Sequence, residues 1–127
     1  MILSLKWSLN NQGGKEKSPT WQEVNEYLKK LKGKAGTLTL DILDGGDIGH
    51  DMLQVRAEND NYMLTFGEIT DDEYIVNFFW DQSLPDESIL LLGDYWSERQ
   101  LTKDFYFVVR VFREFFETGN VSKDLLN

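Results

Sequence analysis

The 127-residue chain contains no cysteine, a single histidine (His50) and two prolines. Without cysteine it can have no disulfide framework, no thiol nucleophile and no cysteine-ligated metal site. No apolar run approaches the roughly 18 residues that span a bilayer. The first residues, MILSLKWSLN, lack a basic start and are interrupted by Ser4, Lys6 and Ser8, so they do not match a secretory signal. We therefore expect one cytoplasmic domain over residues 1–127 that makes no membrane contact.

Basic residues are scarce in the middle of the chain, and the net charge is −9. Residues 1–34 carry seven lysines and three glutamates, whereas residues 35–101 carry two arginines and fifteen acidic residues. Because nucleic acids and anionic membranes bind basic surfaces, the acidic block predicts neither as a partner. It has two interpretations: a solvated surface that favours solubility, or a patch complementary to a basic protein.

Alternation of apolar and polar residues predicts half-buried β-strands along most of the chain. The expected strands are 2–9, 36–43, 52–58, 62–68, 73–80 and 88–93. The last of them has apolar residues on both faces, which is typical of a central strand. The polar segment NNQGGKEK at 10–17 is predicted to be a loop.

A first amphipathic helix is expected over residues 19–32, where apolar side chains form a stripe about 120° wide. Two starts are open: Ser18 caps the helix ahead of a proline, or Thr20 caps it and Glu23 closes a capping box. Gly33 ends the helix.

A second helix is expected near 102–118, starting at a Thr102 cap and ending at Gly119. Its apolar arc is about 200° wide, which predicts that it is largely buried against the sheet. The element order is then β-α-β-β-β-β-β-α. We predict an α+β fold with a five- to six-stranded, mostly antiparallel sheet and two helices packed on one face.

An antiparallel meander would bring alternate connections to the same end of the sheet. Loop 44–51, turn 69–72 and segment 94–101 would then form one acidic rim, with Trp96 as the anchor of an interface. The other interpretation is that turns attract aspartate and that Trp96 caps the core. The candidate partner-binding residues are Asp44, Asp47, Asp51, Glu68, Asp71, Asp72, Glu73, Asp94, Tyr95, Trp96 and Glu98.

Catalytic chemistry has little support in the sequence. The segment DGGDIGHD offers Asp44, Asp47, His50 and Asp51 as metal ligands, but its spacing is not that of an EF-hand and it has no second nitrogen ligand for zinc. Neither a nucleophile elbow, a phosphate-binding loop nor a dinucleotide fingerprint occurs. We predict a non-enzymatic protein with no metal, no cofactor and no catalytic residue. The alternative is a hydrolase that uses the Asp and His groups of 44–51.

Five segments resemble a known family. They are SPTWQEVNEYLKKL, GTLTLDIL, LQVRAENDNYMLTFGE, LLGDYWSERQLTKDF and VVRVFREFFETGNVSKDLLN. Together they cover residues 18–127, and the stretch 93–127 is the most specific. The family they resemble comprises small bacterial immunity proteins of polymorphic toxin systems, including contact-dependent growth inhibition.

This resemblance implies an antitoxin that binds and blocks a cognate toxin domain, with no catalytic motif of its own. A small, acidic chain suits an inhibitor of a basic nuclease. The alternative class is an acidic protein-interaction domain of an unrelated pathway, because a fold by itself does not name a target.

Overall fold

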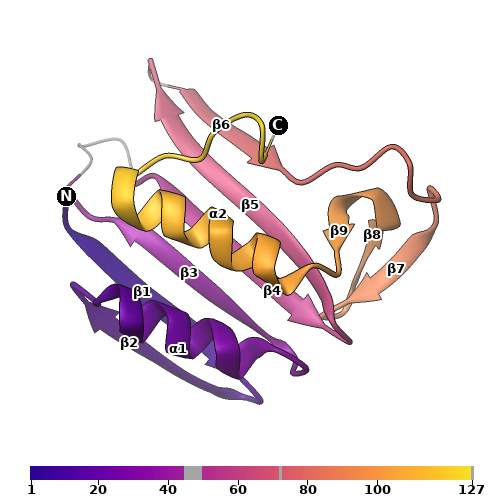
Figure 1. The fold of residues 1–127 in the computed structure, drawn as a ribbon, viewed down its shortest axis with the longest axis horizontal. Coiled ribbons are helices and arrows are strands. Elements are labelled where there is room, and N and C mark those ends of the chain that lie inside the picture. Colours follow the sequence, from indigo (N-terminus) through magenta and orange to yellow (C-terminus); the bar gives the residue numbers. More distant parts are fainter. Residues whose placement is uncertain (45–49, 72, 127) are drawn as a thin grey trace.

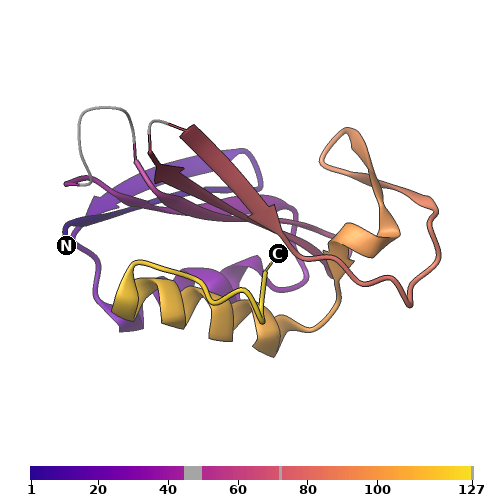
Figure 2. The ribbon, with the colours of Figure 1, turned by 90° about the horizontal axis from the view of Figure 1, so that it is seen from above.

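The computed structural model of the chain describes residues 1–44, 50–71 and 73–126 and shows two layers (Figure 1). One layer is an antiparallel sheet, and both helices lie on one face of it (Figure 2). The predicted α+β class is therefore confirmed. The elements in chain order are β1 (Leu3–Leu9), β2 (Gln12–Lys17), α1 (Trp21–Leu31), β3 (Gly36–Ile42), β4 (Met52–Glu58), β5 (Asn61–Thr70), β6 (Glu73–Phe78), β7 (Ser88–Leu91), β8 (Asp94–Ser97), a 3-10 turn (Glu98–Gln100), β9 (Leu101–Thr102) and α2 (Phe105–Thr118).

The main sheet has the strand order β2-β1-β3-β4-β5-β6, and the short β9 adds to β5. β7 and β8 form a separate hairpin. The register aligns Leu5, Leu40, Leu53 and Phe66 across four neighbouring strands. Because side chains alternate between the two faces of a strand, these four side chains lie on the same face of the sheet. This apolar face is the one that the helices cover.

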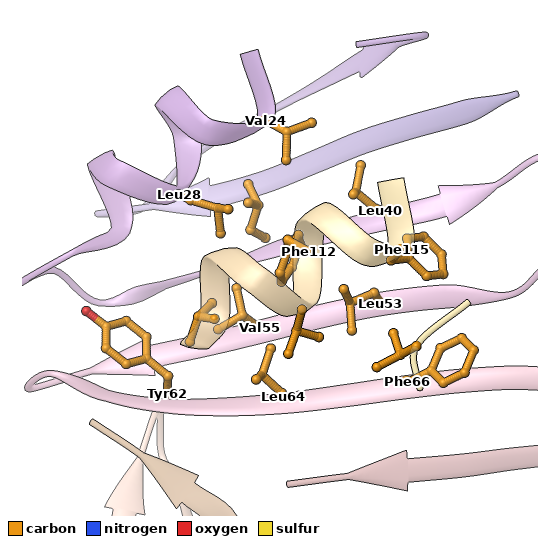
Figure 3. Close-up of a cluster of buried hydrophobic side chains, with 14 of the residues drawn as sticks. Val24, Leu28, Leu40, Leu53, Val55, Tyr62, Leu64, Phe66, Phe112 and Phe115 are labelled. Carbon is orange, nitrogen blue, oxygen red and sulfur yellow. The ribbon is translucent and has the colours of Figure 1, made fainter. Parts of the chain in front are cut away.

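The core lies between that sheet face and the helices (Figure 3). Helix α2 contributes four buried residues, and the Phe115 ring meets Phe66 edge to face with centroids 5.9 Å apart. The helix packs against the sheet as the sequence predicts, but the edges of its apolar arc, Phe105, Phe107, Val109 and Phe116, are only partly buried. The buried residues of the two helices are Val24, Leu28, Leu31, Val108, Val111, Phe112 and Phe115.

Helix α1 begins with the Thr20 capping box. The Thr20 hydroxyl accepts the Glu23 N–H at 3.1 Å, and the Glu23 carboxylate accepts the Thr20 N–H at 2.9 Å. The second helix starts two residues later than expected, because Asp104 rather than Thr102 accepts an N–H of the first turn. Gly119 ends it in the left-handed conformation at φ 75°, as predicted.

The segment predicted as a loop at 10–17 is largely strand β2. Asn10 and Asn11 both adopt positive φ, which forms a tight two-residue turn and returns the chain along β1. Glycine and lysine have low strand propensity, but pairing with an already formed strand overrides it.

Residues 88–93 are not a central strand of the sheet, contrary to the prediction. β7 pairs with β8 alone, through a turn at Leu92 and Gly93. The apolar side chains are instead used in a second, smaller core, where Leu91 packs with Met63 and Leu101. Met63 lies on the sheet face opposite the helices, so the hairpin covers one corner of that face.

Candidate functional site

Five of the predicted site residues lie at one end of the sheet. The β3–β4 and β5–β6 connections are both at this end, next to the N-terminus (Figure 1). The chain places them there because β3, β4, β5 and β6 run as a meander, as the sequence predicts. We call this group the acidic end: Asp44, Asp51, Glu68, Asp71 and Glu73.

Two of these carboxylates hold the backbone. Asp51 accepts the Ile69 N–H at 2.8 Å and so ties the start of β4 to β5. Asp44 accepts the Ile2 N–H at 2.8 Å and lies 3.6 Å from the N-terminal ammonium group. The hydrogen bond from Ile2 lowers the pKa of Asp44, and the ammonium group adds to the effect.

Of the other three acidic residues, Asp71 and Glu73 are exposed and Glu68 is half-buried. Glu68, Asp71 and Glu73 make no side-chain hydrogen bond or ion pair with the described part of the chain. Asp71 sits at positive φ in the β5–β6 turn, a conformation that aspartate tolerates. These three groups therefore present an uncompensated negative surface.

The remaining candidates lie at the opposite end of the sheet, so the prediction of a single rim is wrong. β9 pairs with Tyr62 and Met63 at the start of β5, and Leu92 N–H donates to Glu58 at the end of β4. The β7–β8 hairpin is therefore at the far end of the sheet (Figure 1). β6 itself runs back toward this far end, and β7 does not return along the sheet but pairs with β8 in a hairpin there. The displaced candidates are Asp94, Tyr95, Trp96 and Glu98.

Trp96 packs against the small second core. It is half-buried there, and the Arg56 guanidinium lies 5.7 Å from its ring centroid. This contact supports the interpretation in which Trp96 covers apolar side chains. Its neighbour Tyr95 is 72% exposed and pairs across the hairpin with Leu90, which is 50% exposed.

Sequence reasoning missed a surface on β6. It predicted residues 73–80 as a half-buried strand, without its place in the sheet, and β6 is the last strand, with a neighbour on one side only among the described residues. Tyr74, Ile75 and Val76 are 51%, 39% and 45% exposed. The composition of the strand carries no signal of this position, because strand order is set by the whole topology.

Tyr74 connects this surface to the acidic end. Its phenol lies over Gly67 of β5, where any side chain would collide with it. Burial raises the pKa of Tyr74, and the nearby carboxylates of Asp41 and Asp51 raise it further. An exposed aromatic ring and several carboxylates thus share one corner of the sheet.

Two predicted residues, Asp47 and Asp72, lie outside the described residues, as does most of DGGDIGHD. Within residues 1–44, 50–71 and 73–126, no three His, Asp or Glu side chains come together as metal ligands. None of the helices described is both long and apolar enough to cross a bilayer.

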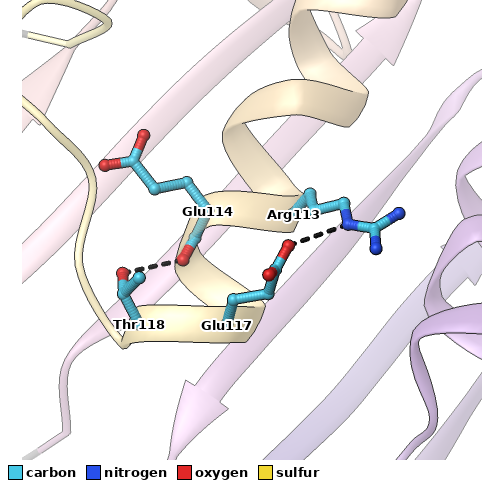
Figure 4. Close-up of polar contacts among 4 residues, drawn as sticks. All are labelled: Arg113, Glu114, Glu117 and Thr118. Atoms are coloured by element: carbon cyan, nitrogen blue, oxygen red, sulfur yellow. Dashed lines mark hydrogen bonds and ion pairs between the residues drawn. The ribbon is translucent and has the colours of Figure 1, made fainter.

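A shallow hollow of about 530 Å³ runs along the outer face of α2. Some of the polar groups that line it pair with each other within α2 (Figure 4). Arg113 pairs with Glu117 at 2.8 Å, and the Thr118 hydroxyl donates to the Glu114 carbonyl at 2.7 Å. This internal pairing makes it a weaker candidate for a charged partner than the acidic end.

The described structure defines a two-layer α+β protein with an acidic, partly apolar corner. The chain belongs to DUF6911, a family of unknown function, which matches residues 4–125. A crystal structure of a hypothetical protein from Neisseria gonorrhoeae has a similar fold, with a TM-score of 0.78 and 17% identity over 95% of this chain and 90% of that one. At this identity the likeness shows the fold alone. No curated protein matches the chain.

Proposed function

We propose that this protein is an immunity protein that binds and neutralises a cognate bacterial toxin domain with a basic surface, such as a nuclease, in the cytoplasm. One observation carries the proposal: the carboxylates of half-buried Glu68 and of exposed Asp71 and Glu73 lie at the end of the sheet where β6 begins. On β6 Ile75 is exposed on the face of Glu68, and Tyr74 and Val76 are exposed on the other face. A partner of this class is also what the sequence resemblance to immunity proteins implies.

The charge supports fast association with a basic partner. A concentrated negative surface steers a positively charged protein toward it and raises the association rate, most strongly at low salt. A nuclease needs a basic surface to bind the phosphate backbone of its nucleic-acid substrate. An acidic inhibitor therefore competes for the surface that the toxin uses on its substrate.

The apolar part supports a long-lived complex. Binding energy concentrates in a few large side chains, often Tyr or Trp, that are surrounded by weaker contacts. Tyr74 has this character and lies at the same end of the sheet, where the nearby carboxylates are those of Asp41 and Asp51. The strand register places it on the sheet face opposite Glu68 and Glu73. Tyr74 replaces Trp96 as the anchor candidate, because Trp96 is half-buried against the second core at the other end of the sheet.

The test uses the product of the gene directly upstream of the gene for this chain, where the immunity role predicts a toxin. Its binding to the native protein is compared with binding to two double variants, Asp71→Asn/Glu73→Gln at the acidic end and Asp94→Asn/Glu98→Gln at the opposite end. Both remove two negative charges, so they are matched in net charge. We expect the first to slow association by about tenfold at low salt and the second to have a much smaller effect.

Four results would contradict the proposal. The first two are that the protein encoded next to this chain does not bind it, and that this chain does not protect cells producing that protein. Equal slowing by both double variants would show that net charge matters but this surface does not. A loss of binding confined to the Asp94/Glu98 variant would move the interface to the β7–β8 hairpin.

A further inference from the structure

We infer that the free side of β6 accepts a β-strand: an extended, basic segment of the partner protein pairs with it and enlarges the sheet. This inference rests on the proposed function, and it specifies how the partner is held. It starts from the strand itself, because an unpaired strand edge binds through its backbone as well as its side chains.

β6 is unpaired along its full length on one side. It ends the order β2-β1-β3-β4-β5-β6, and no strand among the described residues pairs with its outer side. In an antiparallel strand, alternate N–H and C=O groups point away from the existing partner. Six residues give an edge of roughly 20 Å, which is the length of an ordinary strand.

The two edges of the sheet differ in a way that singles out β6. Edges are commonly protected from association by charged side chains, lysine above all, and by proline or bulges. The β2 edge follows this rule, with Lys15, Glu16 and Lys17. Residues 73–78 contain neither lysine nor proline, and three consecutive side chains, Tyr74, Ile75 and Val76, are exposed.

Charge complementarity selects the occupant. The β6 edge begins at the acidic end, so an added strand lies beside Glu73 and near Asp71 and Glu68. Lysine or arginine on that strand compensates these carboxylates. A second copy of this chain brings its own acidic end and a net charge of −9, which opposes β6-to-β6 pairing. The partner is therefore a basic strand of another protein.

The experiment uses two synthetic peptides of about eight residues, long enough to span β6. One alternates lysine with valine and the other alternates glutamate with valine. Each is titrated into the native chain, into Val76→Lys and into Leu90→Lys. The two variants make the same change of charge at apolar strand residues of similar exposure, 45% for Val76 and 50% for Leu90. Thermal unfolding confirms that both variants are folded.

We expect the lysine peptide to bind the native chain and to slow amide hydrogen exchange in β6. Its Kd should rise by about tenfold for Val76→Lys and stay nearly unchanged for Leu90→Lys. The glutamate peptide should bind far more weakly than the lysine peptide.

Three results would overturn the inference. The lysine peptide does not bind the native chain, or it loses equal affinity for Val76→Lys and Leu90→Lys. The third is protection from amide exchange that is confined to β2 or to β7–β8. A native dimer in sedimentation equilibrium that Val76→Lys dissociates would assign the edge to a second copy.

The toxin test separates this inference from the proposed function. If the toxin binds native protein and Val76→Lys equally, the strand addition is wrong and the immunity role stands. If the lysine peptide binds at β6 but the neighbouring toxin does not bind, the immunity role is wrong and the strand-accepting edge stands.

Discussion

At the scale of single residues, the close approach of Tyr74 to Gly67 shapes the acidic corner. Glycine is needed at position 67 because the phenol of Tyr74 occupies the space of a side chain there. The same contact partly buries the phenol, which is the main cause of its raised pKa. An aromatic ring on an edge strand is thereby held in place rather than left mobile in solvent.

Gly67→Ala should push the Tyr74 ring away from the sheet. The pKa of Tyr74 should then fall back toward about 10, because burial and the Asp41 and Asp51 carboxylates no longer disfavour the phenolate. NMR titration of the Tyr74 ring measures this directly. Thr65→Ala on the same strand is the control, and an unchanged Tyr74 pKa in Gly67→Ala would contradict the contact.

The sign of the linked stability effect follows from the raised pKa. A phenol whose pKa is higher in the folded state stabilises the fold below about pH 10, and this contribution is lost as pH rises through the folded pKa. Gly67→Ala should therefore lose less stability between neutral and strongly alkaline pH than the native chain does.

Phe112 tests the core at the same scale. It is fully buried between α2 and the sheet. Phe112→Ala should lower the free energy of unfolding by about 3–5 kcal/mol, through lost apolar contact and the cavity left behind. Denaturant unfolding measures it, with exposed Tyr106→Ala on the same helix as control. A loss below about 1 kcal/mol would contradict the placement of α2.

At the scale of elements, the β7–β8 hairpin depends on a few side chains. A two-stranded hairpin is marginal on its own, so its position depends on packing against the sheet. Leu91 and Trp96 supply that packing, together with the hydrogen bond from Leu92 to Glu58 at 3.1 Å. The hairpin is therefore the element most easily released from the fold.

Trp96→Ala should release the β7–β8 hairpin from the sheet without unfolding the rest of the chain. We expect a loss of about 2 kcal/mol in unfolding free energy and faster amide exchange in residues 88–97, since a half-buried aromatic contact is removed. Binding of the proposed toxin at the acidic end should change little. Tyr95→Ala, which removes an exposed ring from the same strand, is the control and should affect neither quantity. A Trp96→Ala variant of native stability that loses toxin binding would restore Trp96 as the anchor.

At the scale of the whole molecule, charge is separated along the sheet. Lysines gather on the β1–β2 side and on α1, whereas carboxylates gather at the acidic end. Like charges that are not paired destabilise the folded state by mutual repulsion. The acidic end is therefore kept at some cost in stability, as binding surfaces often are.

Asp71→Asn/Glu73→Gln should consequently stabilise the free protein slightly while weakening its complex. The gain should be at most about 1 kcal/mol, largest at low ionic strength and small at about 0.5 M salt, because exposed charges are screened. Thermal unfolding at two salt concentrations measures it. A clear fall in the Tm of the variant would show that these carboxylates support the fold instead.

The sequence by itself determined the local structure of this protein. Alternation located five strands of the main sheet, and the 3.6-residue period located both helices with their buried faces. The Thr20 capping box and the Gly119 end were readable because caps depend on side chains only a few residues apart. The ends of β3 and β5 and the starts of β4 and β6 were also predicted to lie at one end of the sheet, because consecutive antiparallel strands fix the ends at which they are joined.

Only the tertiary structure decided which strands are edges and where residues 88–102 go. The alternation of apolar and polar residues shows which face of a strand is buried. It does not show which strand lies beside it and supplies its hydrogen bonds. Strand β2 was not predicted, because its residues are polar and it is stabilised by pairing with β1. Strand β7 was predicted to be central, because its apolar residues contribute to a second core. The exposed edge of β6, on which the proposed strand addition depends, therefore emerged from strand order, a property of the assembled sheet.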